Sequence, residues 1–135
     1  MSAQPKEVVR SFTAAVSAHD VERMRELLAD DCTYEICGFE LPGAGAYIKA
    51  QILEILPGVL SLFEDGSPEV EIVQLIGEGP WVACESTAGG RFRNGVAYEN
   101  RYVILYEVVD GRVRNVREYM DTQHAASLMA SGTAV

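Results

Sequence analysis

Cysteine and histidine are scarce in this chain. There are three cysteines, Cys32, Cys37 and Cys84, and two histidines. An odd cysteine count without a C-x-x-C pair does not support a disulfide framework, and His19 and His124 lie too far apart in the sequence to suggest a zinc site. We therefore expect free, buried thiols, no metal and no cofactor.

Basic residues and long apolar runs are also in short supply. Eleven Lys and Arg residues stand against 20 Asp and Glu, a net charge of −9, which argues against binding to a phosphate backbone. Nowhere do 18 apolar residues follow one another, and the N-terminal MSAQPKEVVR has no apolar segment behind its basic residues. We expect a cytoplasmic protein with neither nucleic acid nor a membrane as partner.

What is present fits one globular domain over residues 1–135. Of the 135 residues, 48% are apolar and 23% charged, which is typical of a chain large enough for a core or an internal cavity. Disorder is expected only at the ends, and the segment 123–135 is a candidate for a disordered tail.

Helical periodicity dominates the first half of the chain. Apolar residues at helical spacing predict a helix over 4–18 and a second over 21–30, which Asp20 can cap. The alternating CTYEIC predicts a strand, and the stretch after it has the glycine and proline density of a loop. A third helix is predicted over 46–63, and Pro57 and Gly58 should end, kink or split it.

Strands dominate the second half. Residues 67–90 predict two strands joined near Gly77 to Gly79, and NG and DG turns then lead into and out of a long strand that begins near Tyr98. Neighbouring strands joined by short turns are mostly antiparallel. Helices followed by such strands predict an α+β domain.

Side-chain alternation in the last two strands singles out one carboxylate. One face of the first strand carries three tyrosines, Asn100 and Ile104, while the other face is charged. In the second strand Val116, Glu118 and Met120 share the drier face. An ionised carboxylate there is costly, so Glu118 needs either a buried partner or a use.

Three segments resemble a known superfamily: FTAAVSAHDVERMRELLADDCTYE, NGVAYENRY and DGRVRNVREYMDT. They are similar to the fold shared by nuclear transport factor 2, ketosteroid isomerase and SnoaL-like polyketide cyclases, and to the SnoaL-like branch in particular. The resemblance implies a cone-shaped α+β fold in which three helices from the N-terminal half pack on a curved, mostly antiparallel mixed sheet that encloses an apolar pocket. It also implies a homodimer formed sheet to sheet.

The resemblance points to Glu118 and Tyr34 as catalytic residues. Glu118 matches a glutamate in the REFMN setting of phenazine-biosynthesis proteins and an aspartate of limonene epoxide hydrolase, and Tyr34 matches a tyrosine that helps this hydrolase to hold water. Phe12 and Ile36 stand where ketosteroid isomerase has a tyrosine and its catalytic aspartate. The hydrolase's arginine and second aspartate are missing from the matching stretch, residues 84–88. Neither complete machinery is therefore carried over.

Further side chains are expected to line the pocket or to assist the carboxylate. Tyr102 and Asn100 can donate to a developing oxyanion or hold a water. Tyr98 and Tyr106 are interpreted as core or dimer contacts. The expected ligand-binding residues are Tyr102, Asn100, Ile36, Phe12, Cys84, Ser86, Val116 and Met120.

The leading hypothesis is a cofactor-independent enzyme that isomerises, cyclises or hydrates a small apolar or carbonyl-containing molecule by general acid/base chemistry. The alternative is a ligand-binding or dimerisation module of the same fold without chemistry. Three structural outcomes would weaken the enzyme hypothesis: a Glu118 paired with Arg114 or Arg101, a one-residue register shift that turns Glu118 outward, or a pocket filled by core side chains.

Overall fold

A computed structural model describes residues 4–133, which form four helices and one six-stranded sheet. The helices are α1 (Pro5–Ser17), α2 (Val21–Leu27), α3 (Lys49–Leu60) and α4 (Thr122–Gly132). The strands are β1 (Leu28–Ile36), β2 (Gly45–Ile48), β3 (Glu69–Glu78), β4 (Trp81–Arg91), β5 (Ala97–Val109) and β6 (Arg112–Met120). This is the α+β architecture that the sequence predicts.

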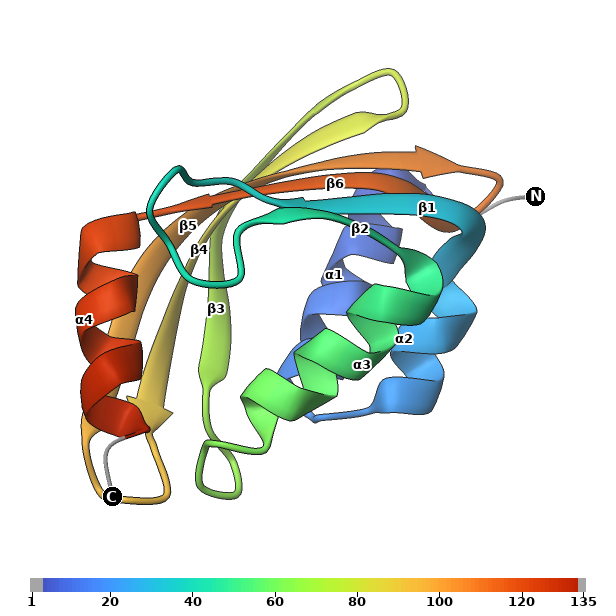
Figure 1. Ribbon diagram of the computed structural model, residues 1–135. Helices are drawn as coiled ribbons and strands as arrows, with labels where there is room; N and C mark the ends of the chain where they lie inside the picture. Colours follow the sequence, from blue (N-terminus) through green and yellow to red (C-terminus); the bar gives the residue numbers. More distant parts are fainter. Residues whose placement is uncertain (1–3, 134–135) are drawn as a thin grey trace.

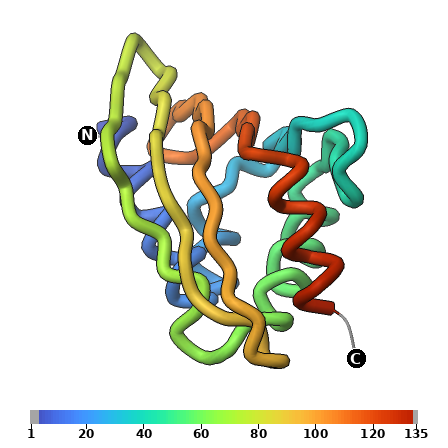
Figure 2. Tube along the Cα trace, turned by 90° about the vertical axis from the view of Figure 1, so that its left-hand side faces the viewer, coloured from blue at the N-terminus to red at the C-terminus, as the bar shows by residue number. Residues whose placement is uncertain are grey.

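The sheet is mixed, with the strand order β2-β1-β6-β5-β4-β3. The last strand, β6, pairs in parallel with β1 and antiparallel with β5, and every other pairing is antiparallel. Figure 2 shows that the long strands β4 and β5 bend along their length. The bent sheet thus presents a concave face to the helices and an outer face on the opposite side (Figure 1).

Helices α1, α2 and α3 cover the concave face (Figure 1). Helix α1 buries Val8, Val9 and Phe12, spaced as one apolar stripe. The Asp20 carboxylate caps α2 by accepting a hydrogen bond from the Arg23 backbone N–H at 3.1 Å. Their buried faces form the main core against the middle of the sheet.

Three element boundaries differ from the sequence-based prediction. The second helix ends at Leu27, because the residues from Leu28 onward pair with β6 instead. The predicted loop contains a short edge strand, β2, which pairs with β1. Helix α3 continues through Pro57, which lies close to its C-terminal end and lacks the N–H for a helical hydrogen bond, while Ile52 and Leu60 stay buried.

The largest difference from the sequence-based prediction is in the C-terminal segment. Helix α4 spans Thr122–Gly132 and so includes residues 123–132 of the segment 123–135 that was expected to be disordered; residues 134–135 lie outside the described part of the chain. Asp121 caps this helix, its Oδ1 accepting from the His124 backbone N–H at 3.0 Å. Gly132 lies so close to the Phe92 ring that a Cβ there would stand 2.3 Å from a ring carbon. The helix is therefore docked on the far end of the sheet (Figure 1).

A second, smaller core lies beneath α4. It consists of Phe63, Ala88, Phe92 and Tyr98, with Leu128 and Met129 packed against it. The Phe63 and Phe92 rings stack with their centroids 4.5 Å apart. None of the helices over residues 4–133 is long and apolar enough to cross a membrane.

Candidate functional site

A cavity of about 140 Å³ lies on the concave face of the sheet and touches both cores. Phe12 of α1, Leu56 and Leu60 of α3, and Met129 of α4 form much of its apolar wall. The floor is made by side chains of the sheet. The core therefore leaves internal space where the helices meet the strands.

Four neighbouring strands each place at least one polar side chain in this cavity, and one from each strand lies on a common line. The strands are β1, β6, β5 and β4, and the side chains on this line are Tyr34, Glu118, Tyr102 and Ser86 respectively. Register explains the alignment: Tyr102 pairs with Ser86, and Glu118 pairs with Ile104, the next residue on the same face of β5. The polar groups thus follow a line that crosses the strands, set in an otherwise apolar surface.

Glu118 is partly buried, and within the described part of the chain its carboxyl group is hydrogen-bonded by one side chain. The Tyr34 hydroxyl donates to its Oε1 at 3.0 Å. Burial raises the pKa of Glu118 from 4.5 to about 7, because desolvation penalises the carboxylate, and the bond from Tyr34 offsets part of this rise. The carboxyl group can therefore both take up and release a proton near neutral pH.

The arginines that could have neutralised Glu118 lie elsewhere. Arg114 forms an ion pair with Asp31 at 3.3 Å, and Arg101 is exposed on the outer face. The register places Glu118 on the same side of the sheet as Ile104, toward the helices. The ion-pair and outward-facing alternatives therefore do not describe this residue.

Tyr34 is buried, and its phenol is held in the neutral form. Burial raises its pKa well above the usual value, and the nearby Glu118 raises it further. The hydroxyl consequently remains a hydrogen-bond donor at any physiological pH. Its position is fixed by β1, where Tyr34 pairs with Val116 of β6, two residues before Glu118.

Five of the ten site residues predicted from the sequence line the cavity: Glu118, Tyr34, Tyr102, Phe12 and Ser86. The other five lie around it. Val116 and Cys84 are fully buried in the main core, and Ile36 packs against that core opposite Glu118. Met120 borders a separate depression that also touches the outer-face residues Val73 and Tyr119.

Asn100 has a structural place rather than one in the cavity. Its Oδ1 accepts from the Arg101 backbone N–H at 2.8 Å, and its amide donates to the Asp121 carbonyl at 3.4 Å. It thereby ties β5 to the residue that caps α4. The burial of this amide within an apolar face is explained by these two bonds.

Most of the other lining residues were not predicted from the sequence, among them Tyr98, Thr13 and Met129. Tyr98 belongs to the second core, in line with its interpretation as a core contact, but its hydroxyl also meets that of Tyr102 at the cavity. Thr13 carries a polar group on the buried side of α1 and gave no signal of its own. Met129 was placed in the expected tail, yet the cap Asp121 and the helical spacing of Ala125, Leu128 and Met129 would have revealed α4.

A larger depression of about 630 Å³ lies on the outer side of the sheet near the start of α4. Its ionisable residues are Glu69, Glu71, Glu99, Arg101, Asp121 and His124, all of which are at least partly exposed. Solvated charges of mixed sign are typical of an ordinary surface. We therefore place the candidate site in the smaller, apolar cavity.

The fold is of the nuclear transport factor 2-like class, and the chain belongs to the SnoaL-like domain family, whose model matches residues 9–116. No curated protein matches it. An NTF2-like protein from Burkholderia xenovorans is 25% identical, with a TM-score of 0.72 over 92% of this chain and 94% of that one.

Two further structures are similar in fold and come from Streptomyces. IdmH, a proposed polyketide cyclase from S. antibioticus, is 20% identical, with a TM-score of 0.77 over 95% of this chain and 99% of that one. AclR, a proposed hydroxylase from S. galilaeus, is 16% identical, with a TM-score of 0.78 over 100% of this chain and 86% of that one. At these identities the similarity establishes the fold alone.

Proposed function

We propose that this protein is a small-molecule enzyme in which Glu118 moves a proton within the apolar cavity, without a cofactor. The observation that carries the proposal is a carboxyl group in an apolar cavity, held by a single Tyr34 hydroxyl, with its pKa raised to about 7. A base with a pKa near the working pH combines the ionised form with adequate strength. The proposed chemistry of IdmH is compatible with this role.

The step that fits this site best is proton removal next to a carbonyl. The C–H bond breaks, its electron pair forms the C=C bond of an enolate, and the proton moves to the Glu118 carboxylate. The neutral acid then returns a proton to carbon, at the same or a conjugated position. Atoms and charges balance without any further reactant, and hydroxyl donors along the floor are suited to stabilise the enolate oxygen.

Exchange of carbon-bound hydrogen tests this step without knowledge of the natural substrate. In D2O, we expect the protein to catalyse deuterium incorporation beside the carbonyl of at least one small ketone, followed by NMR. Glu118→Gln should slow the exchange about 100-fold or more, because the amide is not a base. Wild-type exchange rates in the variant would contradict the proposal.

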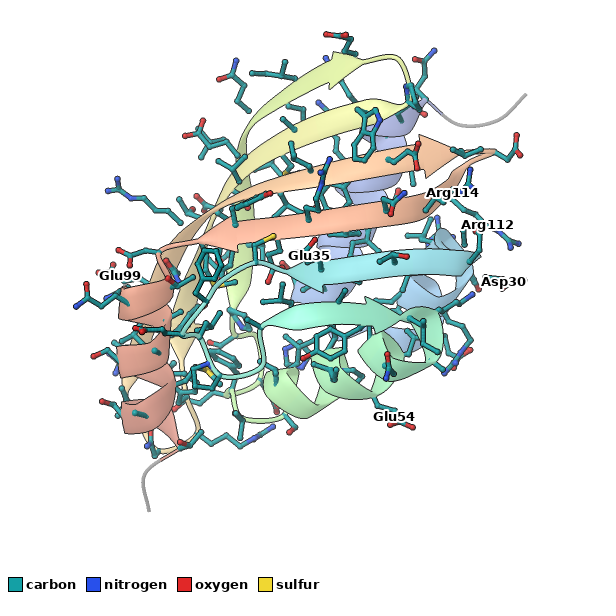
Figure 3. The ribbon with its side chains drawn as sticks, turned by 45° about the horizontal axis from the view of Figure 1, so that its top comes forward. Asp30, Glu35, Glu54, Glu99, Arg112 and Arg114 are labelled. Atoms are coloured by element: carbon teal, nitrogen blue, oxygen red, sulfur yellow. The ribbon has the colours of Figure 1, made fainter. Side chains whose placement is uncertain are left out.

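The matched control is Glu99→Gln, the same chemical change on the outer face of β5, where Figure 3 shows Glu99 near α4. This variant should retain the wild-type rate. Retention separates the loss of the base from the general effect of removing one negative charge.

A second candidate function is ligand binding without chemistry. It is favoured by the composition of the cavity wall, where Glu118 is the only Asp, Glu, Lys, Arg or His among the described lining residues. Tight binding of a ligand that survives Glu118→Gln, with no exchange for any ketone tested, would establish this alternative.

We also propose that two copies of the chain associate through the outer face of the sheet. This face exposes Val73, Ile76, Val103 and Tyr119 among charged residues of both signs. Arg101 and Arg117 lie on it beside Glu85 and Glu107. A two-fold arrangement can therefore set the arginines of one copy against the glutamates of the other.

A further inference from the structure

The hydroxyls of Tyr98 and Tyr102 form a hydrogen-bonded pair at the cavity, apart from the bond between Tyr34 and Glu118. The two tyrosines lie four residues apart on the same face of β5. Phe63 and Phe92 hold the Tyr98 ring by edge contacts, with centroids 5.1 and 5.6 Å away. The pair is thus positioned by the second core.

The two hydroxyls of this pair carry one more hydrogen than the bond between them uses. Two hydroxyls bring two hydrogens, and the bond between them uses one. Over residues 4–133, the second hydrogen is not donated to any carbonyl or carboxylate oxygen, and the Asn100 amide acts toward Tyr98 as a donor. The remaining hydrogen is therefore available to an acceptor inside the cavity.

The volume of the cavity limits the size of the molecule that can carry this acceptor. The space measures about 140 Å³. An apolar protein cavity of about 150 Å³ holds one benzene molecule. A single ring of roughly six to eight non-hydrogen atoms fills such a space, whereas fused ring systems exceed it.

We propose that the cavity takes a single-ring molecule with one acceptor oxygen, which receives its hydrogen bond from the Tyr98 and Tyr102 pair while the apolar ring contacts the α3 and α4 walls. This inference deepens the proposed function by naming a substrate class, and only the proton transfer rests on that function. The binding mode itself does not require Glu118 to act.

Three probes test the ligand class: cyclohexanone, its hydrocarbon isostere methylenecyclohexane, and the two-ring ketone 2-decalone. Binding is followed by NMR titration of wild type and of Glu118→Gln. We expect cyclohexanone to bind about five- to tenfold more tightly than the isostere, as one hydrogen bond predicts, and 2-decalone to bind more weakly than cyclohexanone. Equal affinity for the ketone and the isostere, tighter binding of 2-decalone, or no binding of cyclohexanone would overturn the inference.

Tyrosine variants test the hydroxyl pair. Each of Tyr98→Phe and Tyr102→Phe leaves one hydroxyl, whose hydrogen is then free, so each should keep most of the preference for the ketone. The double variant should lose it while binding the isostere as before. If the double variant still prefers the ketone to the isostere, the inference is overturned. If the double variant does not fold, the inference is overturned when both single variants lose that preference.

The two proposals fail separately. Ketone-selective binding that depends on the tyrosines, with no deuterium exchange, would support the ligand class and contradict the proposed catalysis. Exchange that depends on Glu118, with no contribution from the tyrosine pair to ketone binding, would give the opposite result.

Discussion

At the residue scale, the central feature is an acid that the fold partly deprives of water. Among residues 4–133, Glu118 keeps one donor, Tyr34, and has no cationic partner in exchange for its hydration. Such an arrangement costs stability whenever the group is ionised. A residue that lowers stability in this way is typical of a site where function takes precedence over packing.

The energetic cost of ionising Glu118 in the folded protein predicts how the free energy of unfolding depends on pH. The folded protein holds the Glu118 proton up to about pH 7, whereas the ordinary pKa is 4.5. The contribution of this proton is therefore fully present below pH 4.5 and declines as the pH rises to about 7. This contribution to the free energy of unfolding amounts to about 3 kcal/mol.

Urea denaturation of wild type and Glu118→Gln at pH 5 and pH 8 measures this effect. The amide cannot ionise, so the variant should gain stability relative to wild type between the two pH values. Glu99→Gln, the outer-face control, should show no comparable gain. A wild type that loses no more stability than Glu118→Gln over this interval would contradict the assignment.

At this scale, the sequence predicted the features that depend on strand periodicity, namely the face of the sheet on which a side chain lies. Alternation fixed the face on which Glu118 and Tyr102 lie, and the register confirms those faces. It could not show that Tyr98 and Tyr102 are joined through their hydroxyls, because that depends on ring positions set by Phe63 and Phe92. The catalytic role of Glu118 and Tyr34 stays a prediction.

At the scale of elements, helix α4 decides how the cavity is closed. It contributes Met129 to the wall, and its docking depends on the close approach of Gly132 to Phe92. The Phe92 ring is fully buried and stacked on Phe63, so it has little room to move. The position of Met129 in the cavity wall thus depends on Gly132, which has no side chain.

Gly132→Ala tests this link. In an unobstructed helix the change should stabilise by up to about 1 kcal/mol. Here the added methyl group meets the Phe92 ring, and we expect a destabilisation of about 1 to 3 kcal/mol, together with faster amide hydrogen exchange in α4. Ser131→Ala, at an exposed position in the same turn, is the control. A stabilised Gly132→Ala protein would show that α4 is not docked this closely.

The elements themselves were largely predictable from local patterns. Caps, glycine turns and periodicity predicted the first two helices and the hairpins. The start of β1 at Leu28 and the edge strand β2 were not, because the first depends on pairing with the distant strand β6 and the second lies in a glycine- and proline-rich stretch without strand periodicity and forms by pairing with β1. Helical propensity in the segment after Leu27 is overridden by the pairing of β1 with β6.

At the scale of the whole molecule, the outer face of the sheet remains uncovered by helices, as Figure 3 shows in the view onto it. Apolar and charged residues alternate across it, with the Arg117 guanidinium 5.1 Å above the Trp81 ring. A face of this composition suits a reversible contact between subunits.

The proposed dimer predicts the effect of one charge at its centre. Val103→Glu should shift the protein from dimer to monomer in light scattering coupled to size-exclusion chromatography, because it buries an unpaired carboxylate at the contact. Phe39→Glu, an equally drastic change at a fully exposed position away from the sheet, should leave the dimer intact. A wild type that is monomeric at all concentrations tested would rule out the association.

The insertion of β6 between β1 and β5 also affects the timing of folding. Before β6 is in place, β2 and β1 form one ribbon, β3 to β5 form another, and nothing in the pairing pattern joins them. Glu118 lies on β6, the strand that connects the two ribbons. During synthesis, both ribbons leave the ribosome before this strand does, so a growing chain can be substantially folded while it still lacks its acid. Recovery of the site during refolding should therefore coincide with the slowest, most non-local pairing event rather than precede it.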